Sequence, residues 1–271
     1  MTRDQNSADH PGRWAGHTRM TDPGEHAPLV ADLPSGVGPL INVVQGLLIH
    51  SDWLDAYPIG KESFRCMSRE TLPVADRLSQ ILENSALPLH VTHPPCDRSV
   101  GTCRDYALML CSLLRSHGVP ARLRCGFASY FGETWEDHWV CEYWDGPAAT
   151  WRLGDAQLDE TLRDRLAIRF DHADVPRGSF VPAGQAWREC RAGQADPERF
   201  GCGTVAGMWF VKVNVLRDHG ALNNRETSPW DGWRDAPPAR RRVDEGEMPF
   251  LDRVAADPAG AFADAGPDWL G

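Results

Sequence analysis

The sequence lacks several features that would place it in a broad class of protein. It has no run of about 18 apolar residues, so no membrane-spanning helix is expected. The first 20 residues contain no apolar segment of the kind that a secretory signal requires, so the cytoplasm is the expected location. None of the eight cysteines forms a CxxC pair, which removes the usual spacing of a zinc site. A cytoplasmic location predicts that these cysteines remain thiols.

Basic residues are also few relative to acidic ones. The chain has 28 Lys and Arg against 38 Asp and Glu, a formal net charge of −10. This balance argues against general binding to nucleic acid or to an anionic membrane. A length of 271 residues is enough for one large domain or two small ones with a sizeable core.

The first 28 residues are expected to form a disordered tail. They are polar, contain Gly and Pro, and include few large aliphatic side chains, a composition that does not support a packed core. Three histidines lie in this tail, His10, His17 and His26. They could bind a metal ion, but solvated spacers are the preferred interpretation.

A single domain is expected after this tail. Order should begin near Leu33, which predicts a domain over residues 33–271. Within it we expect a catalytic core at about 72–160 and a helical and loop extension at about 161–271. Apolar residues at helical spacing, together with weaker patterns near the C-terminus, predict helices at 38–50, 72–83, 183–192, 205–222 and near 246–256.

The best-specified element is a helix that begins at Cys103. Thr102 is a good N-cap residue, and Asp105 follows it by three positions, close to the capping-box pattern. An apolar stripe of Ala and Leu continues the helix, and Gly118 and Pro120 are typical of its end. Cys103 therefore lies in the first helical turn.

Alternating apolar residues predict three strands after this helix, at 121–131, 137–144 and 150–155. Short connections containing Gly favour antiparallel pairing between them. His138 lies on the second strand and Asp155 ends the third. Both are expected on the sheet face that receives the helix bearing Cys103.

Cys103, His138 and Asp155 have the residue types of a nucleophilic triad. The N–H groups and dipole at a helix start favour the thiolate, and the same N–H groups can hold an oxyanion. A thiolate also needs a base, and the base needs an orienting group. His138 follows Cys103 by 35 residues, and Asp155 follows His138 by 17, which leaves room for the intervening elements.

Each of these residues also has an ordinary structural interpretation, and other carboxylates compete for the orienting role. Glu142 shares the strand face of His138 but lies four residues away, roughly 13 Å at about 3.3 Å per residue. Asp137 points to the opposite face. Asp159 remains open, but Asp155 ends the strand that should lie beside His138.

Three runs of this sequence resemble the transglutaminase-like superfamily: GTCRDYALMLCSLLRSHGVPARLRCGF, DHWVCEYW and WRLGDAQLD. The family has a helix led by Gly-x-Cys and closed by Gly-Ile/Val-Pro-Ala-Arg, then a His strand and a Trp-x-x-x-Asp strand. The resemblance implies that Cys103 is the nucleophile, His138 the general base and acid, and Asp155 the orienting acid. Two departures occur: Trp139 follows His138 directly, and Ala156 stands where the family often has Pro.

The implied fold is α+β and papain-like, with the nucleophile helix packed on an antiparallel sheet and flanked by N- and C-terminal helices. The sequence resembles bacterial transglutaminase-like proteins. This resemblance implies a thioester intermediate formed from a peptide, protein or small amide. Water as acceptor gives an amidase or peptidase, and an amine gives an acyltransferase. No metal or organic cofactor is expected, and the oligomeric state is open.

Two alternatives to a cysteine enzyme remain. The first is a non-catalytic binding module on the same fold, and the second is a redox or metal-binding thiol protein. Eleven tryptophans are many for this length and could form an aromatic groove for a peptide, although packing is the preferred interpretation. Arg122 and Arg124 could hold a substrate carboxylate, although a solvated strand face is favoured.

Overall fold

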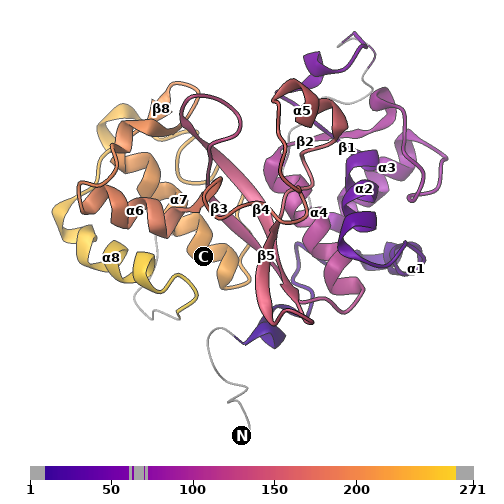
Figure 1. Cartoon of the computed structure of the whole chain (residues 1–271), viewed down its shortest axis with the longest axis horizontal. Helices are drawn as coiled ribbons and strands as arrows, with labels where there is room; N and C mark the ends of the chain where they lie inside the picture. The colour runs from indigo at the N-terminus through magenta and orange to yellow at the C-terminus, as the bar shows by residue number, and fades with distance from the viewer. Residues whose placement is uncertain (1–9, 61–62, 64–69, 71–72, 261–271) are drawn as a thin grey trace, which may run out of the picture. The chain divides into compact units, whose positions relative to one another are not determined.

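The structure is a computed structural model that describes residues 10–60, 63, 70 and 73–260 (Figure 1). It has the expected α+β fold, but the chain divides into two compact units. Unit 1 comprises the N-terminal residues up to His10, Leu123–Trp139 and Pro176–Gly271, and unit 2 comprises Pro11–Arg122 and Val140–Val175. The chain passes between the units inside two strands, β3 (Ala121–Ala128) and β4 (Trp135–Asp145). Neither unit is therefore a continuous stretch of sequence.

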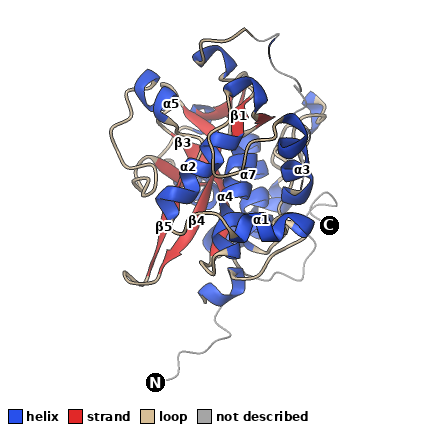
Figure 2. Ribbon diagram, turned by 90° about the vertical axis from the view of Figure 1, so that its right-hand side faces the viewer, coloured by secondary structure: helices blue, strands red, loops and turns tan. Residues whose placement is uncertain are grey.

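Unit 2 is mainly helical. Its described α-helices are α1 (Ala27–Ala31), α2 (Val37–Leu47), α3 (Val74–Asn84), α4 (Cys103–Ser116) and α5 (Glu160–Arg165). Short 3-10 helices are η1 (Pro11–Trp14), η2 (Gly24–His26), η3 (Leu54–Ala56) and η5 (Pro95–Asp97). Helix α4 is central in this unit, and α1, α2 and α3 pack against it (Figure 2). The expected helices at 38–50, 72–83 and from Cys103 are confirmed, except that residues 48–50 turn into a strand.

The start of α4 follows from local chemistry. The side chains and backbones of Thr102 and Asp105 form a capping box. The backbone N–H of Thr102 donates to Asp105 Oδ2 at 2.8 Å, which satisfies a donor that the helix itself leaves without an acceptor. Such a cap contributes about 1 kcal/mol to helix stability. Gly118 follows the helix with a φ of +74°, a conformation that glycine adopts without steric cost.

The strands of unit 2 pair in both orientations. β1 (Leu48–His50) is parallel to β2 (Ser99–Gly101), and β2 leads directly into α4. β5 (Thr150–Gly154) is antiparallel to β4, with Gly154 opposite Cys141. The expected antiparallel pairing of these two strands is confirmed.

Unit 1 combines short strands with three helices. Its further elements are β6 (Phe180–Pro182), α6 (Ala183–Arg191), η6 (Pro197–Arg199), β7 (Phe200–Cys202), β8 (Val205–Ala206), α7 (Met208–Leu222), η7 (Pro238–Arg240), η8 (Glu245–Glu247) and α8 (Met248–Ala256). β3 pairs antiparallel with β6, and β7 antiparallel with β8, but β4 and β7 are parallel. The sheet is therefore mixed, with antiparallel pairing in most of the registers seen.

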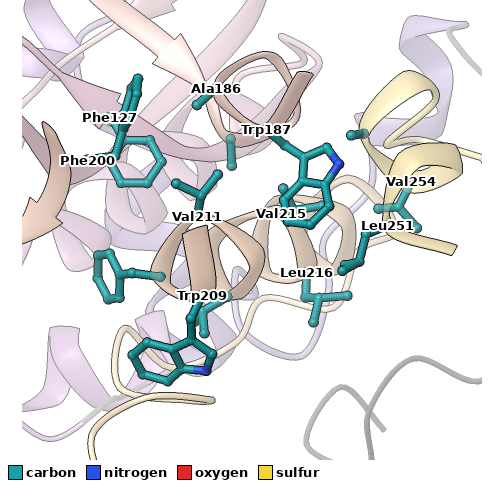
Figure 3. Packing of buried hydrophobic residues seen from close by; sticks show 14 of the residues in the cluster. Phe127, Ala186, Trp187, Phe200, Trp209, Val211, Val215, Leu216, Leu251 and Val254 are labelled. Atoms are coloured by element: carbon teal, nitrogen blue, oxygen red, sulfur yellow. The ribbon is translucent and has the colours of Figure 1, made fainter. Parts of the chain in front are cut away.

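The core of unit 1 gathers around α7. Val211 and Val215 of α7 are buried against Trp187 of α6 and Leu251 of α8, and Phe127 of β3 joins the same cluster (Figure 3). The helix expected at 205–222 begins only at Met208. The preceding residues Val205–Ala206 instead pair with β7, and Gly207 turns the chain with a φ of +97°.

The described part of the N-terminal segment differs from the expected disordered tail. Residues 10–28 form η1, η2 and the start of α1, and the side chain of Trp14 is completely buried. Ser112 Oγ of α4 donates to the carbonyl of Thr21 at 2.6 Å, and Val74 N–H donates to the carbonyl of Met20 at 2.9 Å. The segment is ordered by contacts with residues far along the chain, which local composition does not reveal. Residues 1–9 lie outside the described residues.

The tail histidines take part in these contacts. Nε2 of His17 lies 3.1 Å from Ser116 Oγ, and Nε2 of His26 lies 2.8 Å from Ser79 Oγ. Burial lowers the pKa of His17 below its usual value. These two histidines therefore bond to hydroxyl groups, His17 at an exposed position and His26 at a partly buried one.

Candidate active site

Cys103 is the first residue of α4 and is partly exposed. Thr102 before it is extended, with φ −116° and ψ 173°, so the chain turns sharply into the helix at the cysteine. The amide dipoles at a helix start favour an anion. A thiol in this position is stabilised as the thiolate, the form that acts as a nucleophile.

Gly101 is required by the same cap. A Cβ placed on Gly101 would lie 2.9 Å from Asp105 Oδ2 and 3.0 Å from Asp105 Cβ, closer than real Cβ contacts. The carboxylate that caps the helix therefore occupies the space of a side chain at position 101. This gives a physical reason for the Gly-Thr-Cys order: glycine leaves room for the capping carboxylate, and the cap fixes the turn that bears Cys103.

Asp155 follows the last paired residue of β5 and is 1 % exposed. Its N–H donates to the carbonyl of His172 at 2.8 Å, and its Oδ1 accepts the N–H of Gln157 at 3.0 Å. Burial raises the pKa of Tyr106 well above its usual value, and nearby acidic groups including Asp155 add to the shift. Asp155 therefore lies within electrostatic reach of Tyr106 in α4, which follows Cys103 by three positions.

Asp159, the alternative orienting carboxylate, is held by other groups. Its Oδ1 caps α5 by accepting the N–H of Leu162 at 2.9 Å. Its Oδ2 accepts the hydroxyl of Tyr57 at 2.7 Å and lies 3.9 Å from Arg98. Burial, and then the charge of Asp159, raise the pKa of Tyr57 above its usual value. Both oxygens of Asp159 thus have structural partners, which favours Asp155 for the orienting role.

The two arginines of β3 are neither solvated nor available to a substrate. Arg122 Nε donates to Glu142 Oε2 at 2.8 Å, and Arg124 Nη2 lies 2.8 Å from Asp218 Oδ2. Both arginines are 7 % exposed. The strand pattern showed the alternation of the two arginines but not their acidic partners. The expectation of a solvated strand face and the alternative of a site for a substrate carboxylate are therefore both wrong. The pairing also occupies Glu142, which agrees with its exclusion as an orienting group.

His138 lies on the part of β4 that belongs to unit 1 and is 1 % exposed. Three aromatic rings surround its imidazole: Phe131 at 4.8 Å, Tyr130 at 5.8 Å and Phe180 at 6.5 Å between ring centres. All three meet it in edge-on geometry, which restricts the plane of the ring. The sequence analysis did not predict this aromatic enclosure. Phe180 is 42 residues from His138, and only the consecutive Tyr130 and Phe131 lie near His138 in the sequence.

Neighbouring Asp137 does not compete for the same role. Its Oδ2 lies 3.2 Å from Arg217 Nη1 in unit 1. Burial raises the pKa of Asp137, and Arg217 opposes that shift. Asp137 is therefore committed to a buried ion pair.

Several other cysteines have environments unlike that of Cys103. None of the seven described cysteines forms a disulfide, and Cys66 lies outside the described residues. Burial raises the pKa of Cys141 well above its usual value, and a hydrogen bond with Cys111 adds to the shift. Cys125 Sγ donates to Asn214 Oδ1 at 2.8 Å, and burial raises the pKa of Cys190 to about 11. These surroundings favour the neutral thiol.

The described tryptophans lie both in the core and beside a cavity. Trp14, Trp139 and Trp187 are among the largest fully buried side chains. Trp209 and Trp233 instead line a cavity of about 1050 Å³ in unit 1, beside α7 and the loop that follows it. At least three of the described tryptophans are thus core residues, and two others line a cavity.

Of the three expected site residues, Cys103 and Asp155 lie in unit 2 and His138 lies in unit 1. Among the described residues there is no group of three His, Cys, Asp or Glu side chains suited to holding a metal ion. In the same part of the chain, no helix is long and apolar enough to cross a membrane.

Comparison with known proteins agrees with the resemblance of the motifs. No curated protein matches the chain significantly. A solved structure, named "a Putative Cysteine Protease from Cytophaga hutchinsonii", aligns with 16 % identity and a TM-score of 0.38. The alignment covers 62 % of this chain and 44 % of that protein, so this chain spans less than half of its length. Residues 84–156, which include Cys103, His138 and Asp155, match the sequence profile of the transglutaminase-like superfamily.

Proposed function

We propose that this protein is a cysteine enzyme that transfers an acyl group from an amide or peptide through a thioester on Cys103. The observation that carries the proposal is the position of Cys103 at the start of a capped helix, within the segment that matches the transglutaminase-like superfamily. The helix start favours the thiolate, and its N–H groups supply donors for an oxyanion.

The proposed reaction has two stages. His138 takes the proton from the Cys103 thiol, and the thiolate attacks the carbonyl carbon of the amide. The tetrahedral oxyanion collapses, the C–N bond breaks, and His138 gives its proton to the departing amine. The acyl group remains on sulfur as a thioester. Water or a second amine then attacks that thioester, with His138 accepting its proton and returning one to the thiolate.

Asp155 is proposed to accept the Nδ1–H of His138, which selects the tautomer with Nε2 ready to take a proton. Two observations support this choice. First, Gly154 of β5 lies opposite Cys141 of β4 in the antiparallel register. Asp155 directly follows Gly154, and His138 comes three residues before Cys141, so both lie toward the same end of this strand pair. The competing carboxylate of Asp159 is bound to the α5 N-terminus and to Tyr57.

The acceptor determines whether the enzyme is a hydrolase or a transferase. Both reactions use the same nucleophile, base and orienting group, and differ only in what attacks the thioester. Hydrolysis would release an acid, whereas attack by an amine would form a new amide. The proposed substrate class is therefore an amide, peptide or protein, with either acceptor.

Covalent trapping tests this proposal. The protein is incubated with pools of amides, peptides and thioesters, and its intact mass is followed, with and without an added primary amine. We expect a mass increase that maps to Cys103, is absent from Cys103→Ala and persists in Cys96→Ser, which removes another partly exposed thiol. An added amine that speeds loss of the adduct and appears in the product indicates transfer. A folded wild-type protein that forms no adduct with any pool would instead favour the non-catalytic binding module.

A further inference from the structure

Two buried thiols lie against each other between α4 and β4. Cys111 of α4 and Cys141 of β4 are both completely buried, and their side chains share a hydrogen bond. The thiol of Cys111 also donates to the carbonyl of Ala121 at 3.3 Å. Both cysteines belong to unit 2, and neither takes part in the proposed acyl transfer. The pair is therefore a second place in this fold where sulfur chemistry can occur.

The packing of α4 on the sheet accounts for this contact. Gly154 of β5 lies opposite Cys141 in the antiparallel register along one edge of β4. A Cβ on Gly154 would lie 3.4 Å from Leu110 Cδ2, so the residue before Cys111 packs directly on this register position. β3 runs along the other edge of β4, and there Cys111 bonds to Ala121. Two consecutive residues of α4 thus meet both strands that flank β4, which places Cys111 over Cys141.

Burial shields these thiols from most reagents but not from each other. Burial raises the pKa of Cys141, so its sulfur stays protonated at neutral pH. Oxidation of such a thiol is slow, because the thiolate is the reactive form. Hydrogen peroxide is little larger than water, so it can enter transient openings of a packed core that exclude larger reagents. Once peroxide has oxidised one sulfur, the other sulfur is already in hydrogen-bonding contact with it.

We propose that Cys111 and Cys141 are a modification site, which hydrogen peroxide oxidises to a disulfide that fastens α4 to β4. In the first step one sulfur attacks peroxide: an S–O bond forms, the O–O bond breaks, and the released hydroxide takes the thiol proton as water. In the second step the other sulfur attacks this sulfenic acid: the S–S bond forms, the S–O bond breaks, and hydroxide again leaves as water with the second thiol proton. Two thiols thus give two electrons to one peroxide, and the products are one disulfide and two waters.

The disulfide should stabilise the folded protein. It joins residues 30 positions apart, and a cross-link over such a loop restricts the unfolded chain. It also ties the helix that begins at Cys103 to a strand of the sheet without consuming Cys103. The inference does not depend on the proposed function, because the cross-link forms between two residues outside the triad.

The test is oxidation of the full-length protein by hydrogen peroxide. The remaining thiols are then alkylated in denaturant, and the peptides are mapped without reduction. We expect one cross-linked product that joins the peptides of Cys111 and Cys141, formed in the wild type and in Cys103→Ala alike. The midpoint of thermal unfolding of oxidised Cys103→Ala should exceed that of its reduced form by several degrees, and a thiol reductant should reverse both changes.

Two serine variants separate this pair from other buried thiols. Cys111→Ser can still donate to the carbonyl of Ala121 but cannot form a disulfide, so we expect neither the cross-link nor the rise in midpoint. The matched control is Cys125→Ser. Cys125 is also completely buried, but it lies in unit 1 and donates to Asn214 Oδ1 at 2.8 Å. This control should keep both the cross-link and the rise.

Two results overturn the inference. The first is a folded, peroxide-treated protein in which other cysteines are oxidised while Cys111 and Cys141 both remain free for alkylation. The second is a midpoint that falls or stays unchanged on cross-linking, which would show that the native positions do not accommodate the bond. If Cys111→Ser does not fold, Cys141→Ser replaces it. If neither variant folds, the reversible rise in Cys103→Ala decides, and its absence rejects the site.

Discussion

The guanidinium carbon of Arg122 lies 4.3 Å from the ring centre of Trp14, although the two residues are 108 positions apart. The same guanidinium carbon also lies 4.0 Å from the ring centre of Trp151 in β5. Trp14 and Trp151 also meet edge to face, with their ring centres 5.5 Å apart. The N-terminal segment is thus tied to the strand that precedes Asp155 by an arginine that contacts both indoles.

Replacing Trp14 should therefore destabilise unit 2. A completely buried tryptophan truncated to alanine costs about 3–5 kcal/mol through lost packing and the cavity that remains. We expect Trp14→Ala to lower the midpoint of thermal unfolding by several degrees, measured by circular dichroism. Arg19→Ala, an exposed substitution in the same segment, should leave the midpoint nearly unchanged. Equal midpoints for wild type and Trp14→Ala would mean that the segment does not contribute to folding.

Gly101→Ala should disturb the start of α4. The new Cβ would meet Asp105 Oδ2 at 2.9 Å, so either the carboxylate or the turn must move. We expect a loss of about 1–3 kcal/mol in unfolding free energy, together with slower alkylation of Cys103. Gly38→Ala in α2 is the matched control, because its Cβ would meet nothing within 4 Å and its stability should be equal or slightly higher. A Gly101→Ala protein as stable and as reactive as wild type would contradict this account of the cap.

Two carboxylate substitutions separate the candidates for orienting His138. Asp155→Asn should leave the fold intact but slow turnover by several orders of magnitude, because the amide favours the wrong tautomer of the imidazole. Asp159→Asn should retain most of its activity, since asparagine also caps helices well. Turnover on any substrate found by covalent trapping is the measurement. If Asp159→Asn is the inactive variant and Asp155→Asn is not, the orienting role belongs to Asp159.

His138→Ala should remove thioester formation, because no other group is proposed to take the thiol proton. The alkylation rate of Cys103 near neutral pH should fall with it. His117→Ala serves as a control, because His117 Nε2 lies 3.2 Å from the carbonyl of Val30 and has no role in the proposed reaction. Unchanged turnover in His138→Ala would remove His138 from the mechanism.

Limiting iodoacetamide should label Cys103 before any other thiol at pH 6. An ordinary thiol with a pKa of about 8.5 is less than about 1 % ionised at that pH, whereas helix starts lower the pKa of a thiol. Burial raises the pKa of Cys141 and Cys190, so these two should react last. Peptide mapping of singly labelled protein measures the distribution. Label spread evenly over the cysteines would show that Cys103 is not activated.

Local signals in the sequence were sufficient for the elements that surround the site. The capping box of Thr102 and Asp105 joins residues three positions apart, and the Gly118 turn closes the same helix. Both depend on short-range geometry that residue types specify directly, so the start of α4 and the position of Cys103 were predicted correctly. Alternation along β4 and β5 predicted the two strands, and the short connection between them predicted their antiparallel pairing, which the register confirms.

Only the tertiary structure revealed the partners that are remote in the chain. Burial of Trp14 depends on Arg122 and Trp151, and the composition of residues 10–28 contains no trace of either. Arg77 reads as an ordinary helical arginine until the fold brings it to Asp105, 28 residues later. The periodicity of a sequence indicates which residues share a face of a helix or strand. A buried charge needs a partner of opposite charge, and here that partner lies far away in the sequence. The sequence by itself therefore determined the helix and the place of Cys103 at its start, whereas the groups that support this turn were decided by long-range packing.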